Sequence, residues 1–299
     1  MTSRTARRLQ LRAAAALGSP GGAAIKATDL GAWQVASFRS GIAAVALLCL
    51  VKESRRGWAW QLAPPAMAYA ATLVLFVQAT KLTTAANAIF LQSSAPLYLL
   101  VLGPWLLRER VRRADLALPL VVAVGMALFF VGRESPVETA PDPTRGNVLG
   151  AVSGLTWALT LTGLRWQGRR AGGSGAAVVV AGNAIAFLAC LGPALPVEGA
   201  GWSDLLVLSY LGVFQIGLAY VFVTRALGHV PAFEAATLLL LEPVLNPVWA
   251  WLVHGERVGS LALTGGAVIL TATLLNTWRQ TRASVNAAVG SAASGDRER

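Results

Sequence analysis

The sequence is dominated by long apolar runs that carry little or no charge. Examples cover residues 41–51, 85–107, 116–132, 175–197, 205–224, 235–253 and 260–276. A helix needs about 20 mainly apolar residues to cross roughly 30 Å of hydrocarbon, and several of these runs approach that length. A helix on the surface of a soluble protein would also need a polar face, which these runs do not supply. The sequence therefore predicts an all-α polytopic membrane protein.

The overall composition agrees with this class and argues against a nucleic-acid partner. Hydrophobic residues make up 55% of the chain and charged residues 13%, which is about half the charged share of ordinary soluble domains. The net charge is +11, and the basic residues cluster in short segments between apolar runs, as the positive-inside rule predicts for cytoplasmic loops. We therefore expect the chain to meet a lipid bilayer rather than nucleic acid.

The apolar runs divide into about ten predicted transmembrane helices. They cover roughly 11–28, 32–51, 62–82, 84–107, 114–132, 146–165, 175–195, 203–227, 232–254 and 258–277. The first is short, carries Arg12 and is interrupted by the sequence GSPGG at 18–22, so a break or a shift in register is expected there. The segment 281–299 is rich in small, polar and charged residues and is predicted to be a disordered cytoplasmic tail.

A shift of the sequence on itself by 147 residues reveals an internal repeat. Pro96 falls on Pro243 and Glu109 falls on Glu256, each glutamate being followed by Arg-Val, and no gap is needed. Self-similarity at a fixed spacing indicates a duplicated unit. We therefore predict a first repeat over 1–137, an extracytoplasmic linker over 138–145, a second repeat over 146–280 and the tail over 281–299.

Each predicted repeat contains five spans, so the second copy must enter the membrane in the opposite sense. The charges of two equivalent loops agree, because RERVRRAD (108–115) contains four arginines and HGERVGS (254–260) contains one. By the same rule the acidic loops 133–145 and 196–204 lie outside, and both termini lie in the cytoplasm. Inverted five-helix repeats in an inner or plasma membrane are a recurrent basis for alternating-access transport.

The repeated motif also resembles a known family. Its residues are Ala85, Pro96 and Glu109 in the first half and Ala232, Pro243 and Glu256 in the second. Together with AIKAT (24–28), FRSG (38–41) and LLLLEPVLNPVWAWLVHGERV (238–258), they resemble the EamA repeat of the drug/metabolite transporter superfamily over about residues 13 to 278. The resemblance implies ten helices in two inverted repeats around a central cavity. It also implies a transporter of small organic solutes, which often exports amino acids, metabolites or drugs.

Glu242 is the most informative candidate for substrate binding or coupling. It lies near the middle of the ninth predicted span, where an ionised carboxylate is costly and usually faces a transport pathway. A carboxyl group in that position is a candidate proton carrier. The alternative is a structural role, in which Glu242 accepts a hydrogen bond from backbone that Pro243 leaves free in a neighbouring helix.

Lys26 and Arg39 are cationic candidates in the first two spans. Either could bind a substrate carboxylate or neutralise Glu242. The alternative for both is snorkelling, in which the aliphatic stem lies along the helix and the charged group reaches the membrane surface. Arg39 lies only a few residues beyond the first predicted turn, so snorkelling or a helix-end role is the favoured interpretation for Arg39.

Uncharged polar and aromatic residues inside the spans complete the candidate cavity lining. They are Gln92, Ser93, Trp157, Gln215 and Tyr220. Hydrogen bonds between helices are the alternative role for the amides and hydroxyls. Trp157 could stack on an organic substrate, or it could pack against other helices or lipid.

Pro96 and Pro243, with Glu109 and Glu256, form a predicted structural or gating motif. Each glutamate has two interpretations. One is a gate residue that is salt-bridged in a single conformation. The other is a carboxylate that ends a span and balances the arginine after it, and the expected exposed loop position favours this second interpretation.

The residues needed for enzymatic or ATP-driven chemistry are not found in the sequence. Only His229 and His254 are present as histidines, at span ends, and no HExxH, GxSxG or phosphate-loop motif occurs. No metal or cofactor is expected. The main hypothesis is a secondary transporter that exports a small organic solute, with protons as the candidate coupling ion. Two alternatives stay open: an exchanger of anionic or phosphorylated metabolites that uses Lys26 and Arg39, and a non-transporting membrane scaffold.

Overall fold

The computed structural model describes residues 3–95, 97–99, 102, 117–131, 136–168, 174–227, 238–239 and 241–295. The regular structure in these ranges is helical, apart from an isolated β-bridge between Val137 and Ala140. Two residues of the predicted gating motif, Pro96 and Glu109, lie outside the described residues.

The helices follow one another with short connections. In the first half they are α1 (Ser3–Gly18), α2 (Gly21–Lys26), α3 (Ala32–Leu50), the 3-10 turns η1 (Lys52–Arg55) and η2 (Trp60–Leu62), α4 (Ala63–Leu82), α5 (Ala85–Gln92) and α7 (Ala117–Val131). In the second half they are α8 (Pro143–Gly168), α9 (Gly175–Ala194), α10 (Trp202–Ser209), the π-helix η4 (Tyr210–Leu218), α11 (Ala219–Leu227), α13 (Leu241–His254) and α14 (Ser260–Gly295).

Five helical stretches in the described residues are long and apolar enough to cross a membrane. They are Ala32–Leu50, Trp60–Leu82, Pro143–Leu164, Gly175–Ala194 and Trp202–Val223, and shorter apolar helices cover Leu120–Val131 and Ser260–Leu275. The prediction of an all-α polytopic membrane protein is therefore confirmed. The count of about ten spans and their division into inverted repeats remain predictions.

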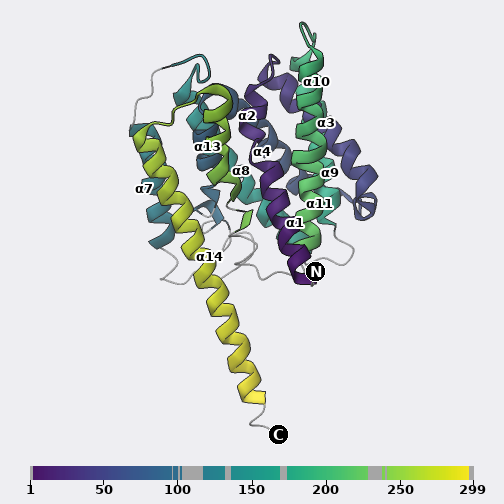
Figure 1. Ribbon diagram of the computed structural model, residues 1–299. Coiled ribbons are helices and arrows are strands. Elements are labelled where there is room, and N and C mark those ends of the chain that lie inside the picture. Colours follow the sequence, from purple (N-terminus) through teal and green to yellow (C-terminus); the bar gives the residue numbers. More distant parts are fainter. Residues whose placement is uncertain are drawn as a thin grey trace.

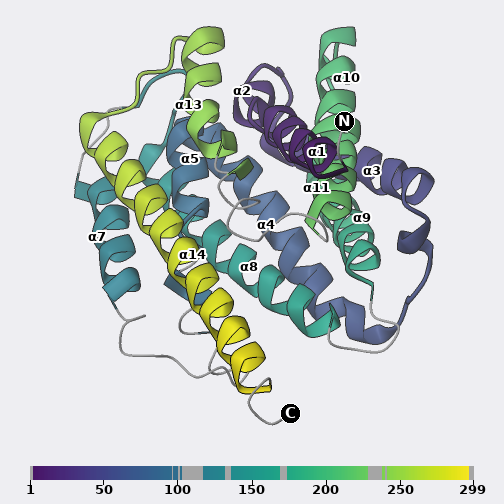
Figure 2. The same cartoon turned by 60° about the horizontal axis from the view of Figure 1, so that its bottom comes forward.

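The helices form a bundle in which the two halves of the chain pack against each other (Figure 1). Helix α4 lies at the centre against α8 and α9, α3 packs on α9, and α7 packs on α14 at one edge of the bundle (Figure 2). The start of α1 and the far end of α14 project from the same end of the bundle (Figure 1). This placement agrees with an even number of crossings.

Small residues allow the helices to approach closely. A Cβ atom on Gly265 of α14 would lie 2.5 Å from the carbonyl oxygen of Gly125 of α7, and one on Gly154 of α8 would lie 2.9 Å from the carbonyl oxygen of Leu91. Helices in lipid associate through van der Waals contact at such positions rather than through the hydrophobic effect. The glycines are therefore part of the packing that positions the candidate site.

The first predicted span is broken, as the sequence GSPGG led us to expect. Helix α1 ends at Gly18, α2 begins at Gly21, and Ser19 and Pro20 form the turn between them. Proline has no N–H to continue the helical hydrogen bonds, so Pro20 accepts from the backbone N of Ala24 at 2.8 Å but donates to none of the preceding residues. Backbone groups freed in this way at membrane depth require partners from neighbouring helices.

The structure differs from the sequence prediction at the C-terminus. Helix α14 continues to Gly295 and extends well beyond the bundle, through much of the segment 281–299 that we predicted to be a disordered tail (Figure 1). The segment is rich in alanine and contains no proline. Alanine has the highest helix propensity, so the last span can propagate into this segment.

Candidate functional site

The break between α1 and α2 lies against polar side chains from the second half of the chain. Gly18 faces the carboxyl group of Glu242, because a Cβ atom at position 18 would lie 2.8 Å from both Cδ and Oε2. Gly21 packs in the same way on the side-chain amide of Gln215, and Gly22 on that of Asn246. Glu242 and Asn246 lie one turn apart on α13, so one face of that helix meets the broken segment.

Two of these polar groups have a buried oxygen without a hydrogen-bond partner. The Oε1 atom of Gln215 and the Oδ1 atom of Asn246 are inaccessible to solvent and accept no hydrogen bond, and Asn246 is 2% exposed. Within the described parts of the chain, no side chain or backbone group bonds to the carboxylate of Glu242, and no cation pairs with it. A buried polar group without a partner costs free energy, and in a membrane protein such a group marks a candidate pathway.

Aromatic residues hold the broken segment next to this polar group. The Tyr210 hydroxyl donates to the carbonyl oxygen of Leu17 at 2.7 Å, and the Trp249 indole N–H donates to Oγ of Ser19 at 3.0 Å. The ring of Tyr210 stacks on Phe214, with centroids 6.1 Å apart. Tyr210 begins the π-helix η4, which also carries Gln215. A π-helical stretch within a span is frequently associated with a functional site.

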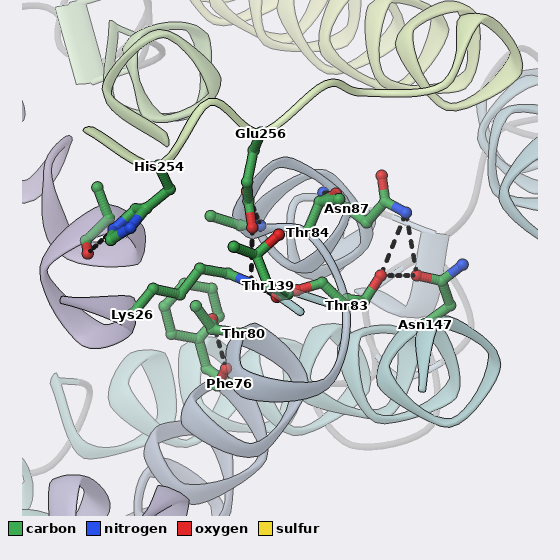
Figure 3. Close-up of polar contacts among 12 residues, drawn as sticks. Lys26, Phe76, Thr80, Thr83, Thr84, Asn87, Thr139, Asn147, His254 and Glu256 are labelled. Carbon is green, nitrogen blue, oxygen red and sulfur yellow. Dashed lines mark hydrogen bonds and ion pairs between the residues drawn. The ribbon is translucent and has the colours of Figure 1, made fainter. Parts of the chain in front are cut away.

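At the other end of α2, a buried ion pair joins the two halves (Figure 3). The Nζ atom of Lys26 lies 2.7 Å from Oε1 of Glu256, and the two side chains are 4% and 1% exposed. The Lys26 ammonium also donates to the carbonyl oxygens of Thr83, at 2.8 Å, and of Thr139. Oε2 of Glu256 accepts from the backbone N of Ala85 at 2.9 Å, so the carboxylate also satisfies an N–H in the first turn of α5.

Two interpretations from the sequence are wrong at this position. Glu256 is 5% exposed and pairs with Lys26, whereas we favoured an exposed carboxylate balanced by Arg257. Lys26 neither reaches the membrane surface nor neutralises Glu242. The physical reason is the turn after α13, where Gly255 adopts a left-handed φ of 66° and ends the helix in the manner typical of glycine. The chain then folds back and places the next residue over the ends of α2 and α5.

The comparison with known proteins assigns the chain to a family. The model of the EamA-like transporter family matches residues 13–131 and 144–278, which together make up most of the chain. The chain belongs to the EamA-like transporter family. This EamA-like protein is therefore a multi-pass membrane transporter, as the resemblance in its motifs implied.

Proteins similar to this EamA-like transporter include a named exporter and a protein of known crystal structure. The pseudopaline exporter of Pseudomonas aeruginosa (strain UCBPP-PA14) is 28% identical over 257 residues, which cover 81% of this chain and 85% of the relative. A protein of known crystal structure superposes with a TM-score of 0.60 and 20% identity, covering 93% of this chain and 99% of the other. The second likeness supports the fold alone.

Arg39 of the EamA-like transporter occupies a different position from the one expected. Its side chain is 1% exposed in the interior, so the expectation of snorkelling is wrong. Nη2 donates to the carbonyl oxygen of Leu73 at 3.0 Å, while Nε has no hydrogen-bond partner. Helices α4 and α9 and the π-helix η4 pack on α3, so the side chain of Arg39 lies among neighbouring helices.

Three of the sequence candidates gather around Tyr69 of α4, which sequence analysis did not single out. The Trp157 ring lies 6.4 Å from the Tyr69 ring, centroid to centroid, and Arg39 and Tyr220 are both close enough to Tyr69 to interact electrostatically. A tyrosine inside a predicted span was the available signal. The structure therefore places Arg39, Trp157 and Tyr220 around Tyr69, whereas Gln215 lies with Glu242 at the helix break.

The remaining candidates have ordinary structural surroundings or stay open. The Ser93 hydroxyl donates to the carbonyl oxygen of Ile89 in its own helix at 2.7 Å, which is the common role of serine in a span. Gln92 is half-buried at the end of α5.

Pro243 lies in the first turn of α13, where its missing N–H is tolerated. No described contact of the Glu242 carboxylate tests the structural role considered for it, so that role stays an alternative.

Proposed function

We propose that this transporter is a secondary exporter of a small organic solute, working by alternating access between two inverted five-helix repeats. Export is the direction named for its relative from Pseudomonas aeruginosa. Secondary transport fits a chain whose sequence carries no phosphate-binding loop. The carboxyl group of Glu242 is the proposed coupling group, with protons as the coupling ion.

The packing of the helices supports the repeat. If the five spans of the first half correspond in order to those of the second, α4 corresponds to the span of η4 and α11, and α3 to α9. The contact of α4 with α8 then has its counterpart in the contact of α11 with α1, and that of α4 with α9 in that of η4 with α3. The contacts α3–α9, α5–α13 and α7–α14 each join two spans that correspond to each other, so exchanging the halves leaves these contacts unchanged. A two-fold relation between halves would produce this pattern.

The observation that carries the proposal is the unpartnered polar group at the break between α1 and α2. Broken helices that meet polar side chains of the opposite repeat form the substrate sites of many secondary transporters. Here Glu242, Gln215 and Asn246 come from the second half, and the broken helix comes from the first. Movement between the halves would expose or cover these groups, which is the requirement of alternating access.

The buried pair of Lys26 and Glu256 gives this site a candidate gate. By the charge rule for loops, the turn that carries Glu256 lies on the extracytoplasmic side, and both chain termini lie in the cytoplasm of a cell with this protein in its plasma or inner membrane. The ion pair ties α2 to that turn. We propose that the pair closes the external path and that its separation opens the path.

The alternative functions have less support from these contacts. An exchanger of anionic metabolites would use Lys26 and Arg39 as anion ligands. The Lys26 ammonium is occupied by Glu256 and by two carbonyl oxygens, and Arg39 already donates to the carbonyl oxygen of Leu73. A passive scaffold would gain nothing from the buried oxygens of Gln215 and Asn246, which lack hydrogen bonds and so reduce stability.

Flux measurements test the proposal. The purified full-length protein is reconstituted in proteoliposomes and offered a panel of radiolabelled amino acids, cationic and neutral drugs, and sugar phosphates, with protein-free liposomes as the control. We expect saturable flux of one class that rises with an opposing proton gradient. Absence of saturable flux across the whole panel would contradict the proposed function and favour the scaffold.

A further inference from the structure

The polar groups at the helix break are all hydrogen-bond acceptors or carry acceptors without a partner. When it is ionised, the Glu242 carboxylate can accept hydrogen bonds but cannot donate one. Oε1 of Gln215 and Oδ1 of Asn246 are carbonyl-type oxygens without hydrogen bonds. These atoms come from two helices, η4 and α13, and meet the same short segment of the first span, from Gly18 to Gly22.

The aromatic donors near these acceptors are engaged with other groups. The Tyr210 hydroxyl donates to the carbonyl oxygen of Leu17, and the Trp249 indole donates to Oγ of Ser19. Two buried cations of the first half are also occupied, because Lys26 is paired with Glu256 and Arg39 donates to the carbonyl oxygen of Leu73. In the described residues, the two amide oxygens accept no hydrogen bond, and no cation pairs with the carboxylate.

From this imbalance we infer that the site binds a solute with a protonated amine, whose ammonium group contacts Glu242 and the oxygens of Gln215 and Asn246. The inference rests on the proposed function, since it names the chemical class of the solute at that site. An ammonium group offers three N–H donors and one positive charge, which match three acceptor groups and one negative charge. The solute thus supplies what the neighbouring side chains do not.

The aromatic residues indicate what the rest of the solute resembles. Tyr210 interacts electrostatically with Glu242 and stacks on Phe214, and Trp249 donates to Oγ of Ser19 in the break. Aromatic faces attract organic cations through their quadrupole. An amine with an apolar or aromatic body therefore fits the surroundings better than a small inorganic cation. An anion would instead meet an unneutralised carboxylate in a low-dielectric environment, where like charges repel strongly.

A set of three probes of similar shape separates the contribution of charge from that of shape. They are 2-phenylethylamine, 2-phenylethanol and 3-phenylpropionate, titrated calorimetrically into the detergent-solubilised full-length protein at neutral pH. We expect the amine to bind at least about tenfold more tightly than the alcohol or the acid, which is the low end for a charge-assisted hydrogen bond. Equal or tighter binding of the acid, or no detectable binding of the amine, would overturn the inference.

Three variants connect the preference to the site. Glu242→Gln keeps the shape of the side chain and is expected to reduce the preference for the amine to less than about threefold, whereas Glu242→Asp retains the charge and should retain a preference for the amine. Glu198→Gln, in an exposed loop, is the matched control and should bind like the wild type. If Glu242→Gln elutes as a folded monodisperse protein and keeps the full preference for the amine, the assignment to Glu242 is wrong. If it does not fold, the Glu242→Asp variant decides, because loss of the amine preference there contradicts a purely charge-based contact.

The inference and the proposed function can fail separately. Saturable flux of neutral or anionic solutes in proteoliposomes, without any preference for amines, would overturn the amine inference and leave the transporter proposal intact. Specific amine binding that depends on Glu242, combined with no flux of any solute, would overturn the transporter proposal and support the ligand class.

Discussion

The Nζ atom of Lys26 lies 2.7 Å from Oε1 of Glu256, although the two residues are far apart in the sequence. The pair is buried and crosses between the halves of the chain, with the Glu256 side chain descending from the turn after α13 (Figure 3). Pairs of this kind are costly to disrupt one partner at a time, because the remaining charge stays buried. Substitutions in this pair therefore test how much the contact between the two halves contributes to stability.

Lys26→Met is expected to destabilise the protein by about 3–5 kcal/mol, because it leaves the Glu256 carboxylate buried without a counter-charge. The double variant Lys26→Met/Glu256→Gln should recover a large part of this loss, since neither charge remains. The measurement is the thermal unfolding midpoint of the detergent-solubilised protein.

Arg257→Ala is the matched control for this pair. Arg257 is exposed beside Glu256, and exposed substitutions usually change stability by less than about 0.5 kcal/mol. A loss of stability in Arg257→Ala comparable with that in Lys26→Met would restore the interpretation that Glu256 balances the neighbouring arginine. A double variant no more stable than Lys26→Met would show that the charge pair is not the cause.

Glu242→Gln is expected to abolish the dependence of transport on a pH gradient while leaving expression in the membrane intact. Glutamine occupies the same volume but cannot take up or release a proton, so a gradient of protons can no longer drive the exchange. The measurement is solute flux into proteoliposomes with and without an imposed pH difference. Glu198→Gln serves again as the control, and a pH dependence that survives in Glu242→Gln would remove Glu242 from the coupling mechanism.

Gly22→Ala is expected to reduce stability by about 1–3 kcal/mol, the usual cost of overpacking, and to impair transport. Its Cβ would lie 2.8 Å from Cβ of Ala85 and from Oδ1 of Asn246, so α2 would have to move away from both. Unfolding midpoints and flux of the purified variant measure the two effects.

Gly192→Ala supplies the comparison for Gly22→Ala. No atom lies within 4 Å of a Cβ at position 192, which lies inside α9. Because alanine has a higher helix propensity than glycine, this variant should be as stable as the wild type or slightly more stable. Equal behaviour of Gly22→Ala and Gly192→Ala would argue against close packing of the helix break on α13.

Opposite orientation of the two repeats predicts opposite accessibility of equivalent loops. Single cysteines replace Arg112 and Ser260 in a background that lacks the native Cys49 and Cys190. We expect a membrane-impermeant maleimide to label position 260 in intact cells, and position 112 only after the membrane is permeabilised. Labelling of both positions from the same side would contradict the inverted repeats and the alternating-access proposal with them.

The class of the protein and several local features were predictable from the sequence. The long uncharged runs allow little besides helices in a bilayer, because every backbone N–H and C=O group must be satisfied within the segment. The break between α1 and α2 was predictable as well, since Pro20 and the adjacent glycines act on their own turn. The Pro-to-Glu spacing of the motif indicated the family, which the match over both halves then established.

The partners of the buried charges were decided by the tertiary structure alone. A transmembrane helix is apolar on nearly all sides, so its sequence periodicity does not reveal which side faces the interior and which faces lipid. From the sequence, Lys26 was as good a partner for Glu242 as for any other carboxylate. Only the packing of α13 and its following turn on α2 brings Glu256 to Lys26 and leaves Glu242 beside Gly18 without a partner. The sequence determined that the chain crosses a membrane and where its helix breaks, whereas the docking of the halves determined which charges are neutralised, because ion pairs depend on distances in space.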